Sequence, residues 1–449
     1  MNKGGDIVLV LKNATVVEFY PTSIQDSVDI VIDGSKIAAV GTGIAANYQA
    51  DRVLDIQGKL VMPGLVCSHN HFYSGLSRGI TATIAPSPDF ISVLKNLWWR
   101  LDLAIDEEIL YYSGMVCSLE AIRCGTTSVI DHHASPAFLK GSLKTLKQAF
   151  EETGLRGITC YETTDRNEGL KEVEAGVQEN VDFAKLCESD KQATNGNHLV
   201  EAMIGGHAPV TMPDAALKLM ADAVRATGRG VHVHVAEDRY DVSHSHHLYG
   251  KDLIVRLNDY DLINDKALLV HGVHLSDQDI EIINAKDAFL AHNARSNMNN
   301  NVGYSTKLSL YKNLVLGTDG MGSDMWEEMK FAYFKHKDVA GSMWPDSYLK
   351  FLYNGNEILK RYFAADFGRV APGYKADLTV LDYQAPTPLV PSNIGGHIVF
   401  GMDSRDVTTV IINGKVVLEN RQFALDVSPI YDKARKAAKR LWDNMDKLP

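Results

Sequence analysis

Lys59-Leu-Val-Met-Pro63-Gly-Leu-Val-Cys-Ser-His69-Asn-His71 is the stretch of sequence that decides the fold. Pro63 and the following glycine interrupt an apolar run, which then ends in a His-x-His triplet. Residues i and i+2 of a strand point to the same face, so both imidazoles can reach one ion. The stretch therefore predicts a buried strand that ends in a metal site. The triplet is a weak signal by itself, because histidines fall two residues apart by chance, and other segments must supply further ligands.

Similar strand-like runs recur between about residues 60 and 370, and amphipathic helical stretches alternate with them. We count eight such runs, which end at His69-Asn-His71, Asp131-His-His133, Tyr161-Glu-Thr163, His207-Ala-Pro209, His234-Val-Ala-Glu237, His271, His292-Asn293 and Asp319-Gly320. Eight strands alternating with helices are typical of a (β/α)8 barrel of about 250 residues, whose active site lies at the carboxyl ends of the strands. Because nearly every run ends in a titratable residue, we expect these residues to line an active site.

The two ends of the chain have a different sequence pattern. Short apolar runs separated by turn signals such as Asp33-Gly34 and Asn413-Gly414 predict β-hairpins within residues 1–60 and again within 371–426. We therefore expect an α/β protein in which residues 61–370 form the (β/α)8 TIM barrel and both chain ends form one small β-sandwich. Residues 427–449 have the apolar spacing and the charge of a C-terminal surface helix.

Composition limits the classes of partner. The chain has 449 residues and a formal net charge of -11, which argues against a general affinity for nucleic acid or for anionic membranes. Its five cysteines include no Cys-x-x-Cys pair, so they predict neither a disulfide framework nor a thiolate zinc site and suit a reducing cytoplasm. The first apolar run is too short for a signal peptide, and no run could span a membrane. We expect a cytoplasmic protein.

The predicted strand ends contain the ligands of a catalytic zinc site. Such a site commonly has three protein ligands and an open position for water. His69, His71, His234 and Asp319 are the candidates. His232 shares a strand face with His234 and is an alternative, but His234 lies nearer the carboxyl end of its strand. A single barrel histidine is usually a buried hydrogen-bonding residue, whereas four candidates together indicate a metal. Water on that metal would have its pKa lowered toward neutrality.

Five segments occur in the order typical of the amidohydrolase superfamily. They are Pro63-Gly-Leu-Val-Cys-Ser-His69-Asn-His71, His234-Val-Ala-Glu237, Leu269-Val-His271-Gly-Val-His274-Leu, His292-Asn-Ala-Arg-Ser296-Asn297 and Gly317-Thr-Asp319-Gly. Within the superfamily the chain resembles the aminohydrolase and chlorohydrolase branch, which includes guanine and S-adenosylhomocysteine deaminases, and most of all the SsnA-type aminohydrolases. The resemblance covers almost the whole chain. The motifs as a set are specific for the superfamily but do not name a substrate.

The resemblance implies one divalent metal ion per subunit, zinc with iron as the alternative, bound by His69, His71, His234 and Asp319. Binuclear relatives carry a carboxylated lysine on the fourth strand, but that strand here reads Glu201-Ala-Met-Ile-Gly-Gly-His207 and has no lysine. A mononuclear site is therefore expected. Cys67 stands where relatives often have Asn or Asp, and we expect it to be a packed thiol. The resemblance also implies a homodimer or higher homo-oligomer.

The resemblance assigns three catalytic roles. Hydrolytic deamination needs an activated water, a proton for the ring and a proton for the departing ammonia. Asp319 is expected to accept the proton of the water, Glu237 to carry it to the ring and the leaving group, and His271 to orient the attacking hydroxide. His274 is a rival to His271, but it lies three residues further on and is expected to be structural.

Substrate contacts follow less directly from the sequence. In this branch the histidine of the fourth strand, here His207, usually faces the heterocycle. Arg166 follows the third strand and could bind a carbonyl or carboxylate group, or it could be an exposed loop residue. Arg78 and Trp98 could line the mouth of the site, although the adjacent tryptophans Trp98 and Trp99 could equally be packing residues.

Other polar residues at the strand ends are expected to have supporting roles. Asp131 is predicted to support the metal ligands, and His132 and His133 to be loop residues. His292 and Asn293 are expected to be structural or to support the ligands from behind.

The cluster His244-Ser-His246-His247 suggests a second metal site, but it lacks a partnered carboxylate pattern. A solvated loop is therefore the expected structure of this segment, and its movement over the substrate is a weaker hypothesis.

Three functions are compatible with the sequence. The first is the deamination of a purine or related nitrogen heterocycle. The second is the opening of a cyclic amide in a purine-degradation intermediate, for which the same hydroxide and acid would serve. The third is a non-catalytic scaffold, which the complete set of metal ligands disfavours.

Overall fold

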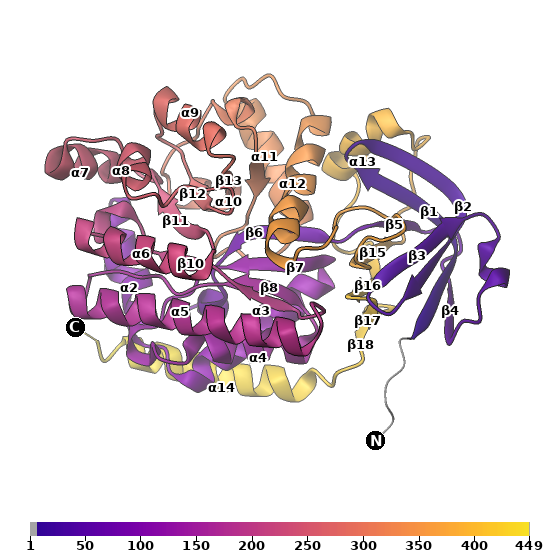
Figure 1. The fold of residues 1–449 in the computed structure, drawn as a ribbon, viewed down its shortest axis with the longest axis horizontal. Coiled ribbons are helices and arrows are strands. Elements are labelled where there is room, and N and C mark those ends of the chain that lie inside the picture. Colours follow the sequence, from indigo (N-terminus) through magenta and orange to yellow (C-terminus); the bar gives the residue numbers. More distant parts are fainter. Residues whose placement is uncertain (1–6, 449) are drawn as a thin grey trace.

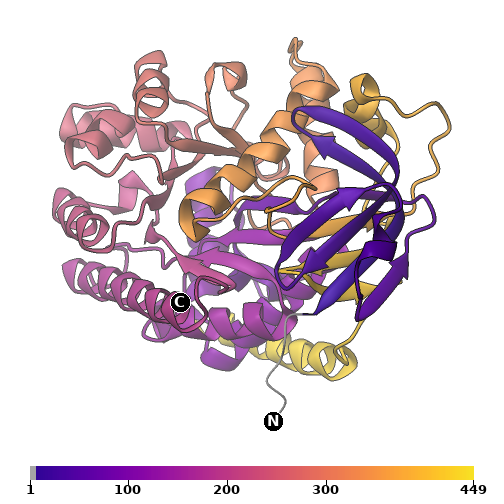
Figure 2. The same ribbon diagram turned by 45° about the vertical axis from the view of Figure 1, so that its right-hand side comes forward.

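The computed structural model describes residues 7–448 of the chain. Residues 1–6, at the start of the segment predicted to join the sandwich, and residue 449 lie outside the described part. Figures 1 and 2 show a central region of strands surrounded by helices and, beside it, a second β-region that contains both indigo and yellow segments. The described part is therefore an α/β structure in which the two ends of the chain meet.

The central strands form a four-stranded sheet, β6-β7-β8-β9, and a five-stranded sheet, β10-β11-β12-β13-β14, in which every neighbouring pair is parallel. Their bounds are β6 (Leu65–Asn70), β7 (Thr126–Asp131), β8 (Arg156–Thr159), β9 (Val200–Ala202), β10 (Ile204–Gly206), β11 (Val231–Val235), β12 (Leu268–His271), β13 (Phe289–His292) and β14 (Leu314–Leu316). Each of the eight predicted runs contains one of these strands, and the fourth run is divided into β9 and β10. Because neighbouring strands are parallel, their carboxyl ends lie at the same end of the sheet.

Two isolated β-bridges connect the margins of these sheets. Asn70 of β6 pairs with Asp319, which follows β14, and Thr163, which follows β8, pairs with Gly206 of β10. The first and last parallel strands are therefore neighbours, although they are far apart in the sequence.

Helices connect the strands and cover their outer side (Figure 1). They are α3 (Glu107–Arg123), α4 (Ser142–Thr153), α5 (Leu170–Ala193), α6 (Asp214–Thr227), α7 (Arg239–Tyr249), α8 (Leu253–Asp259), α9 (Asp277–Ala285), α10 (Ala294–Asn299), α11 (Met325–Asp338) and α12 (Pro345–Phe363). The short helices α1 (Phe90–Val93) and α2 (Trp99–Leu103) lie between β6 and α3. In α6, for example, Leu217, Met220, Ala221 and Val224 are buried, which is the spacing of one helix face. No helix within residues 7–448 combines the length and the apolar character that a membrane span requires.

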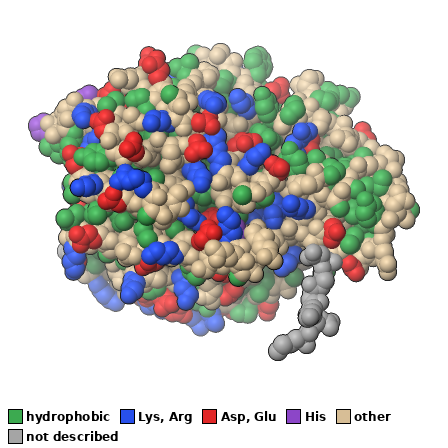
Figure 3. Space-filling model, viewed as in Figure 1, with side chains coloured by type: hydrophobic (Ala, Val, Ile, Leu, Met, Phe, Trp, Pro, Cys, Tyr) green, Lys and Arg blue, Asp and Glu red, His purple; other side chains and the backbone are tan. Residues whose placement is uncertain are grey.

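The histidine cluster at residues 244–247 is not in a loop, so that prediction is wrong. It lies in α7, which begins where the Asp238 side chain accepts a hydrogen bond from the backbone N–H of Tyr240 and ends at Gly250 with a φ of 63°. Capping at both ends allows this polar segment to be helical. His246 and His247 are exposed, and Figure 3 shows histidine side chains at the surface in this region.

Both ends of the chain contribute to one nine-stranded sheet, with the order β18-β17-β16-β15-β5-β1-β2-β3 and β4 paired with β1. Its strands are β1 (Val8–Phe19), β2 (Thr22–Asp33), β3 (Lys36–Gly41), β4 (Arg52–Asp55), β5 (Leu60–Pro63), β15 (Leu378–Leu381), β16 (Val407–Ile412), β17 (Lys415–Glu419) and β18 (Gln422–Phe423). β5 lies between β1 of the N-terminal part and β15 of the C-terminal part. This strand therefore joins the two chain ends.

The segment from Lys59 to His71 belongs to both β-regions. β5 pairs in the nine-stranded sheet, and β6 begins the parallel region only two residues later. Gly64 separates the two strands, and a Cβ atom added at Gly64 would lie 2.1 Å from the hydroxyl oxygen of Thr127. Only glycine fits at this crossing of the chain.

Two helices belong to the C-terminal part of the chain. α13 (Ile394–Phe400) precedes β16, and α14 (Ser428–Met445) is the last helix. In α14, Ala434, Ala437, Leu441 and Met445 are buried in a line along one helix face, and this helix packs on α3. The apolar spacing of the C-terminal segment is thus matched by a helix with one buried side.

A buried ion pair connects the parallel region to the nine-stranded sheet and can be tested. The Arg156 side chain has no exposed surface, and its Nε lies 2.7 Å from Oδ2 of Asp377. The substitution Asp377→Asn leaves this guanidinium without its counter-charge and is expected to cost about 3–5 kcal/mol in the free energy of unfolding. Asp382→Asn is the control, because it removes only a half-exposed pair with Lys59, worth about 0–1 kcal/mol. Equal thermal unfolding midpoints for the two variants would contradict the prediction.

Candidate metal centre and active site

Imidazoles and one carboxylate converge where the parallel strands end. His69 lies in β6 and His71 follows it, His234 lies in β11, and Asp319 follows β14. Nε2 of His71 lies 3.0 Å from Oδ1 of Asp319 and 3.3 Å from Nε2 of His234. Nε2 of His69 lies 3.6 Å from the same carboxylate oxygen. Ligand atoms of His69, His71 and Asp319 lie within 4.8 Å of one another, and His234 shares such a group with His69 and His271.

In each of the three candidate histidines, Nδ1 contacts another group of the protein. Nδ1 of His71 lies 2.6 Å from the carbonyl oxygen of His132, and Nδ1 of His234 lies 2.8 Å from the carbonyl oxygen of His207. Both rings therefore donate through Nδ1 and direct Nε2 toward the other candidate ligands. In His69, Nδ1 contacts Nε2 of His232 at 2.8 Å, whereas Nε2 is buried without a hydrogen-bond partner. Rings oriented in this way are typical of metal sites, so the donor set fits a divalent ion.

These contacts distinguish His234 from His232, the other candidate ligand on the same strand. His232 is fully buried behind His69 and its Nε2 is occupied by that contact. His234 lines the cavity described below, as the position nearer the strand end suggests.

Burial and mutual contacts shift the pKa values of these groups. Burial lowers the pKa of His69 to about 3, so the ring is neutral, as a ligand must be. Burial works to raise the pKa of Asp319, but the neighbouring His69 and His71 rings hold it well below its usual range. Burial works to lower the pKa of His71, but the hydrogen bond and charge of Asp319 outweigh it and raise that pKa to about 9. A bound cation would take the place of the His71 proton.

The loop after β14 fixes the Asp319 carboxylate. The hydroxyl of Ser296 donates to Oδ2 at 2.5 Å, and the backbone N–H of Gly320 donates to Oδ1 at 2.8 Å. Asp319 itself has a φ of 54° and His271 a φ of 71°, a conformation that non-glycine residues rarely adopt. Such backbone conformations are common at active sites, where the surrounding structure holds them in place.

Glu237 and His271 lie beside this group. Oε2 of Glu237 is 3.4 Å from Nε2 of His271, which is 3.8 Å from Oδ2 of Asp319. Nδ1 of His271 lies 2.8 Å from the amide oxygen of Asn297, so Nε2 is the nitrogen that faces the carboxylates. Burial raises the pKa of Glu237 to about 7, although the charge of His271 opposes it. Glu237 can therefore both give and take a proton near neutral pH.

A cavity with about 920 Å³ of empty space, partly open to solvent, opens onto these residues. Its inner part is lined by His71, Glu162, His207, His234, Glu237, His271 and Asp319. Its wall is mostly apolar and includes Phe90, Ile91, Leu94, Trp98, Trp99, Val210 and Met321. An apolar cavity with a few polar groups at one end is typical of a site for a small organic molecule.

Two of the expected substrate contacts line this cavity. Trp98 is in its wall, and His207 is in its inner part. Nδ1 of His207 lies 2.7 Å from the hydroxyl oxygen of Thr211, which itself donates to the carbonyl of Ala208. Burial lowers the pKa of His207 to about 3, so the ring is neutral and its Nε2 is a hydrogen-bond acceptor.

The structure corrects the positions expected for both arginines. Arg78 does not line the cavity, since its side chain is 72% exposed and pairs with Glu120. Arg166 is neither an exposed loop residue nor part of the cavity lining. Its buried guanidinium lies 2.8 Å from Asp102 and 4.9 Å above the ring of Trp99. The charge of Arg166 is thus paired with Asp102 inside the protein and does not face the cavity.

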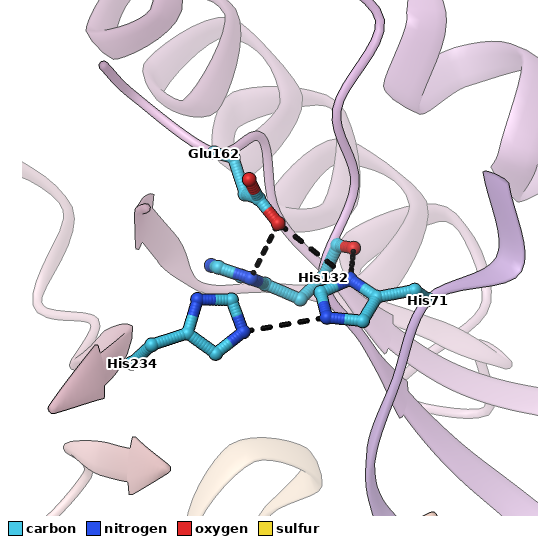
Figure 4. Close-up of side chains that lie close together, drawn as sticks. All are labelled: His71, His132, Glu162 and His234. Carbon is cyan, nitrogen blue, oxygen red and sulfur yellow. Dashed lines mark hydrogen bonds and ion pairs between the residues drawn. The ribbon is translucent and has the colours of Figure 1, made fainter. Parts of the chain in front are cut away.

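His132 and His133 follow β7, as expected of loop residues, but both are fully buried. Nδ1 of His132 lies 3.1 Å from Oε1 of Glu162, and Figure 4 shows this pair next to His71 and His234. The sequence places Glu162 at a strand end but assigns it no role. The titratable residues at the other strand ends were the signal that could have identified it.

The remaining predicted residues surround the site. Asp131 accepts hydrogen bonds from the backbone N–H of Phe72 and the hydroxyl of Thr159, both at 2.7 Å, and so holds the chain after His71. The buried Cys67 thiol contacts the hydroxyl of Thr318 at 3.0 Å, and burial raises its pKa.

Two histidines and one asparagine lie near His271. Nδ2 of Asn293 is 3.4 Å from Nδ1 of His271, and His292 is buried next to the ring of Tyr304. His274 lies outside the cavity lining and contacts the carbonyl oxygen of Val302 at 2.8 Å.

Residues 60–417 match the sequence model of the amidohydrolase family, and the chain belongs to this family. It is a hydrolase of carbon–nitrogen bonds. A 5-methylthioadenosine/S-adenosylhomocysteine deaminase of Pelotomaculum thermopropionicum is 32% identical to it, over 96% of this chain and 98% of the relative. A 5'-deoxyadenosine deaminase of Methanosarcina mazei is 30% identical, over the same shares of the two chains.

Solved structures share the fold. The crystal structure of an adenosine deaminase from Xanthomonas campestris, with bound zinc, superimposes with a TM-score of 0.82 at 23% identity and covers 97% of this chain and 98% of its own. Guanine deaminase from C. acetobutylicum superimposes with a TM-score of 0.74 at 15% identity and covers 91% of this chain and 99% of its own.

Proposed function

We propose that the protein removes an amino group from a purine or a related nitrogen heterocycle by hydrolysis, with one zinc ion held by His69, His71, His234 and Asp319. The observation that carries this proposal is the convergence of three imidazole Nε2 atoms and the Asp319 carboxylate at the inner end of an apolar cavity. The names of the relatives that match over nearly the whole chain favour an adenine-type ring. Iron is the alternative metal.

The metal, when bound, would lower the pKa of a water molecule and so supply hydroxide near neutral pH. Asp319, whose second carboxylate oxygen faces Ser296 and His271, is placed to accept the proton of that water. Glu237, at 3.4 Å from His271, is placed to deliver a proton to the ring nitrogen and then to the departing ammonia. His271 orients the attacking oxygen through Nε2. Water and the amino compound are thereby converted into a carbonyl compound and ammonia.

We also propose that β6 to β14, within residues 61–370, form a closed (β/α)8 barrel. The Asn70–Asp319 and Thr163–Gly206 bridges between the sheet margins support closure. The segments 1–60 and 371–426 would pack as one β-sandwich domain, which is supported by a shared core that contains Leu11, Ile30, Leu378 and Ile411. Assembly as a homo-oligomer in the cytoplasm stays a prediction of the family resemblance and the composition.

Metal content tests the proposed ligands. His69→Ala removes an Nε2 that has no other partner, so zinc should fall from about one ion per chain, the value for a mononuclear site, to nearly none after dialysis. His232→Ala removes only the support behind His69, and zinc affinity should fall by about 10–100-fold. His198→Ala is the control, because this buried histidine pairs with Glu201 and does not line the cavity. Full zinc content in His69→Ala would contradict the ligand set.

Ammonia release tests the reaction. The zinc-loaded protein should release ammonia from at least one member of a panel of aminopurines and their nucleosides. Glu237→Gln should lower kcat by about 10²–10⁴-fold, because it cannot transfer a proton, and Asp319→Asn should abolish turnover without unfolding the protein. Asp338→Asn, at an exposed end of α11, is the control. Substantial turnover by Asp319→Asn would exclude it as the base, and substrate loss without ammonia would indicate ring opening instead.

A further inference from the structure

The short helix α10 places two polar side chains next to the carboxylates of the proposed proton transfer. Ser296 lies in α10, and Asn300 is the residue that directly follows it. Because they are four positions apart, their side chains lie on the same face of the helix, and the backbone N–H of Asn300 donates to the carbonyl oxygen of Ser296 at 2.8 Å. Both residues line the cavity. The last turn of α10 therefore fixes the backbone from which the Asn300 side chain extends.

The side-chain amide of Asn300 contacts three other side chains. Its Nδ2 lies 3.3 Å from Oε1 of Glu237 and 3.3 Å from Oγ of Ser296. Its Oδ1 accepts a hydrogen bond of 3.1 Å from the amide of Asn299. An ionised carboxylate only accepts hydrogen bonds and an amide nitrogen only donates them, so the nitrogen is the Asn300 atom that faces Glu237. The partners on both sides thus set the orientation of this amide.

These contacts complete a chain of hydrogen bonds between Asp319 and Glu237. The hydroxyl of Ser296 donates to Oδ2 of Asp319 at 2.5 Å. The same hydroxyl oxygen accepts from Asn300, whose second N–H donates to Glu237. Asn300 has no proton to release in this chain, because an amide does not titrate near neutral pH. Its contribution is therefore to hold the Glu237 carboxyl in place relative to Asp319.

The two oxygens of Glu237 have different surroundings. Oε1 faces the donor of Asn300, whereas Oε2 lies 3.4 Å from Nε2 of His271. In the neutral imidazole of His271, Nδ1 donates to the amide oxygen of Asn297 at 2.8 Å, so Nε2 is an acceptor. This Nε2 is buried and has no hydrogen-bond partner within residues 7–448. A proton on Oε2 thus has an acceptor nearby, whereas a proton on Oε1 would meet the N–H of Asn300.

We propose that Asn300 is a positioning residue for the proton transfer, because its amide holds Oε1 of Glu237 as an acceptor and leaves Oε2 to take up and release the proton. The proton balance of the reaction is unchanged. The proton that leaves the water is delivered to the ring nitrogen through Oε2, and Asn300 keeps both of its hydrogens. Fixing one oxygen in this way removes the rotation of the carboxyl from the reaction. The proposal rests on the proposed function and names the atom that acts in it.

Crystal structures of the zinc-loaded protein test the contact without turnover. In the unmodified protein, Nδ2 of Asn300 should lie within hydrogen-bond distance of Oε1 of Glu237. Asn300→Leu keeps the branched shape of the side chain without its donor, and Asn300→Asp brings a second carboxylate to Oε1. In both variants the Glu237 carboxyl should leave the position that it has in the unmodified protein. Asn300 is only half-buried, so both variants are expected to fold.

A double-mutant cycle tests the role in catalysis, with kcat measured on any compound of the aminopurine panel that the unmodified protein consumes. Asn300→Leu should lower kcat by about 10–100-fold, because misplacing a reacting group by about 1 Å can cost that much. KM should stay within about 2-fold, since the contact acts on the proton transfer and not on substrate binding. In the Glu237→Gln background, where no proton is transferred through this residue, Asn300→Leu should lower kcat no further. A merely structural role would lower kcat by the same factor in both backgrounds.

Asn313→Leu is the matched control for both experiments. The amide of Asn313 also donates to a carboxylate, at 3.0 Å from Oδ1 of Asp287, but Asn313 lies outside the cavity lining. Its replacement removes the same kind of hydrogen bond and should leave both the position of Glu237 and kcat unchanged.

Three results would overturn the proposal. They are a Glu237 carboxyl in the same position in Asn300→Leu and Asn300→Asp as in the unmodified protein, an equal loss of kcat in both backgrounds, or an Asn300→Leu variant as active as Asn313→Leu. In each case the unmodified protein would still release ammonia, so the proposed function would stand. Failure of the proposed function is distinguishable, because no aminopurine would then release ammonia, while the crystal structures would still decide whether Asn300 holds Glu237.

Discussion

Two backbone hydrogen bonds hold the whole site together. The N–H groups of Thr318 and Asp319 both donate to the carbonyl oxygen of His69 at 3.0 Å. They join the end of the first parallel strand to the loop after the last one, across about 250 residues of chain. At this junction Asp319 has a left-handed conformation, and its carboxylate lies 3.6 Å from His69 and 3.0 Å from His71. Without this junction His69 and His71, which come from the four-stranded sheet, would not be joined to Asp319, which follows the last strand of the five-stranded sheet.

The junction also explains the charge distribution around the cavity. Strand ends that meet at one point bring many histidines and carboxylates into a small buried volume, where each charge must have a partner. Arg166 is paired with Asp102, and His132 is placed beside Glu162. The same burial that brings the ligands together therefore also pairs the charges around them.

Much of the site could be read from the sequence, because strand-end residues have a recognisable pattern. The His-x-His triplet, the Val-His-Val-Ala-Glu segment with Glu237, and the Gly-Thr-Asp-Gly segment each follow an apolar run. The sequence assigns no role to Glu162 or Asp102 and does not predict the burial of His132, since these depend on contacts between residues remote in the chain. The same is true of Arg166, whose partner Asp102 is 64 positions away.

The sequence by itself determined the alternation of strands and helices, the eight strand ends and the family motifs, because these depend on local apolar periodicity and on residue types at fixed spacing. Only the tertiary structure decided which charges are free and which are paired. It placed Arg78 outside the cavity, enclosed Arg166 beside Asp102 and buried His132 beside Glu162. The physical reason is that the state of a buried charge depends on neighbours brought together through space, which sequence spacing does not encode.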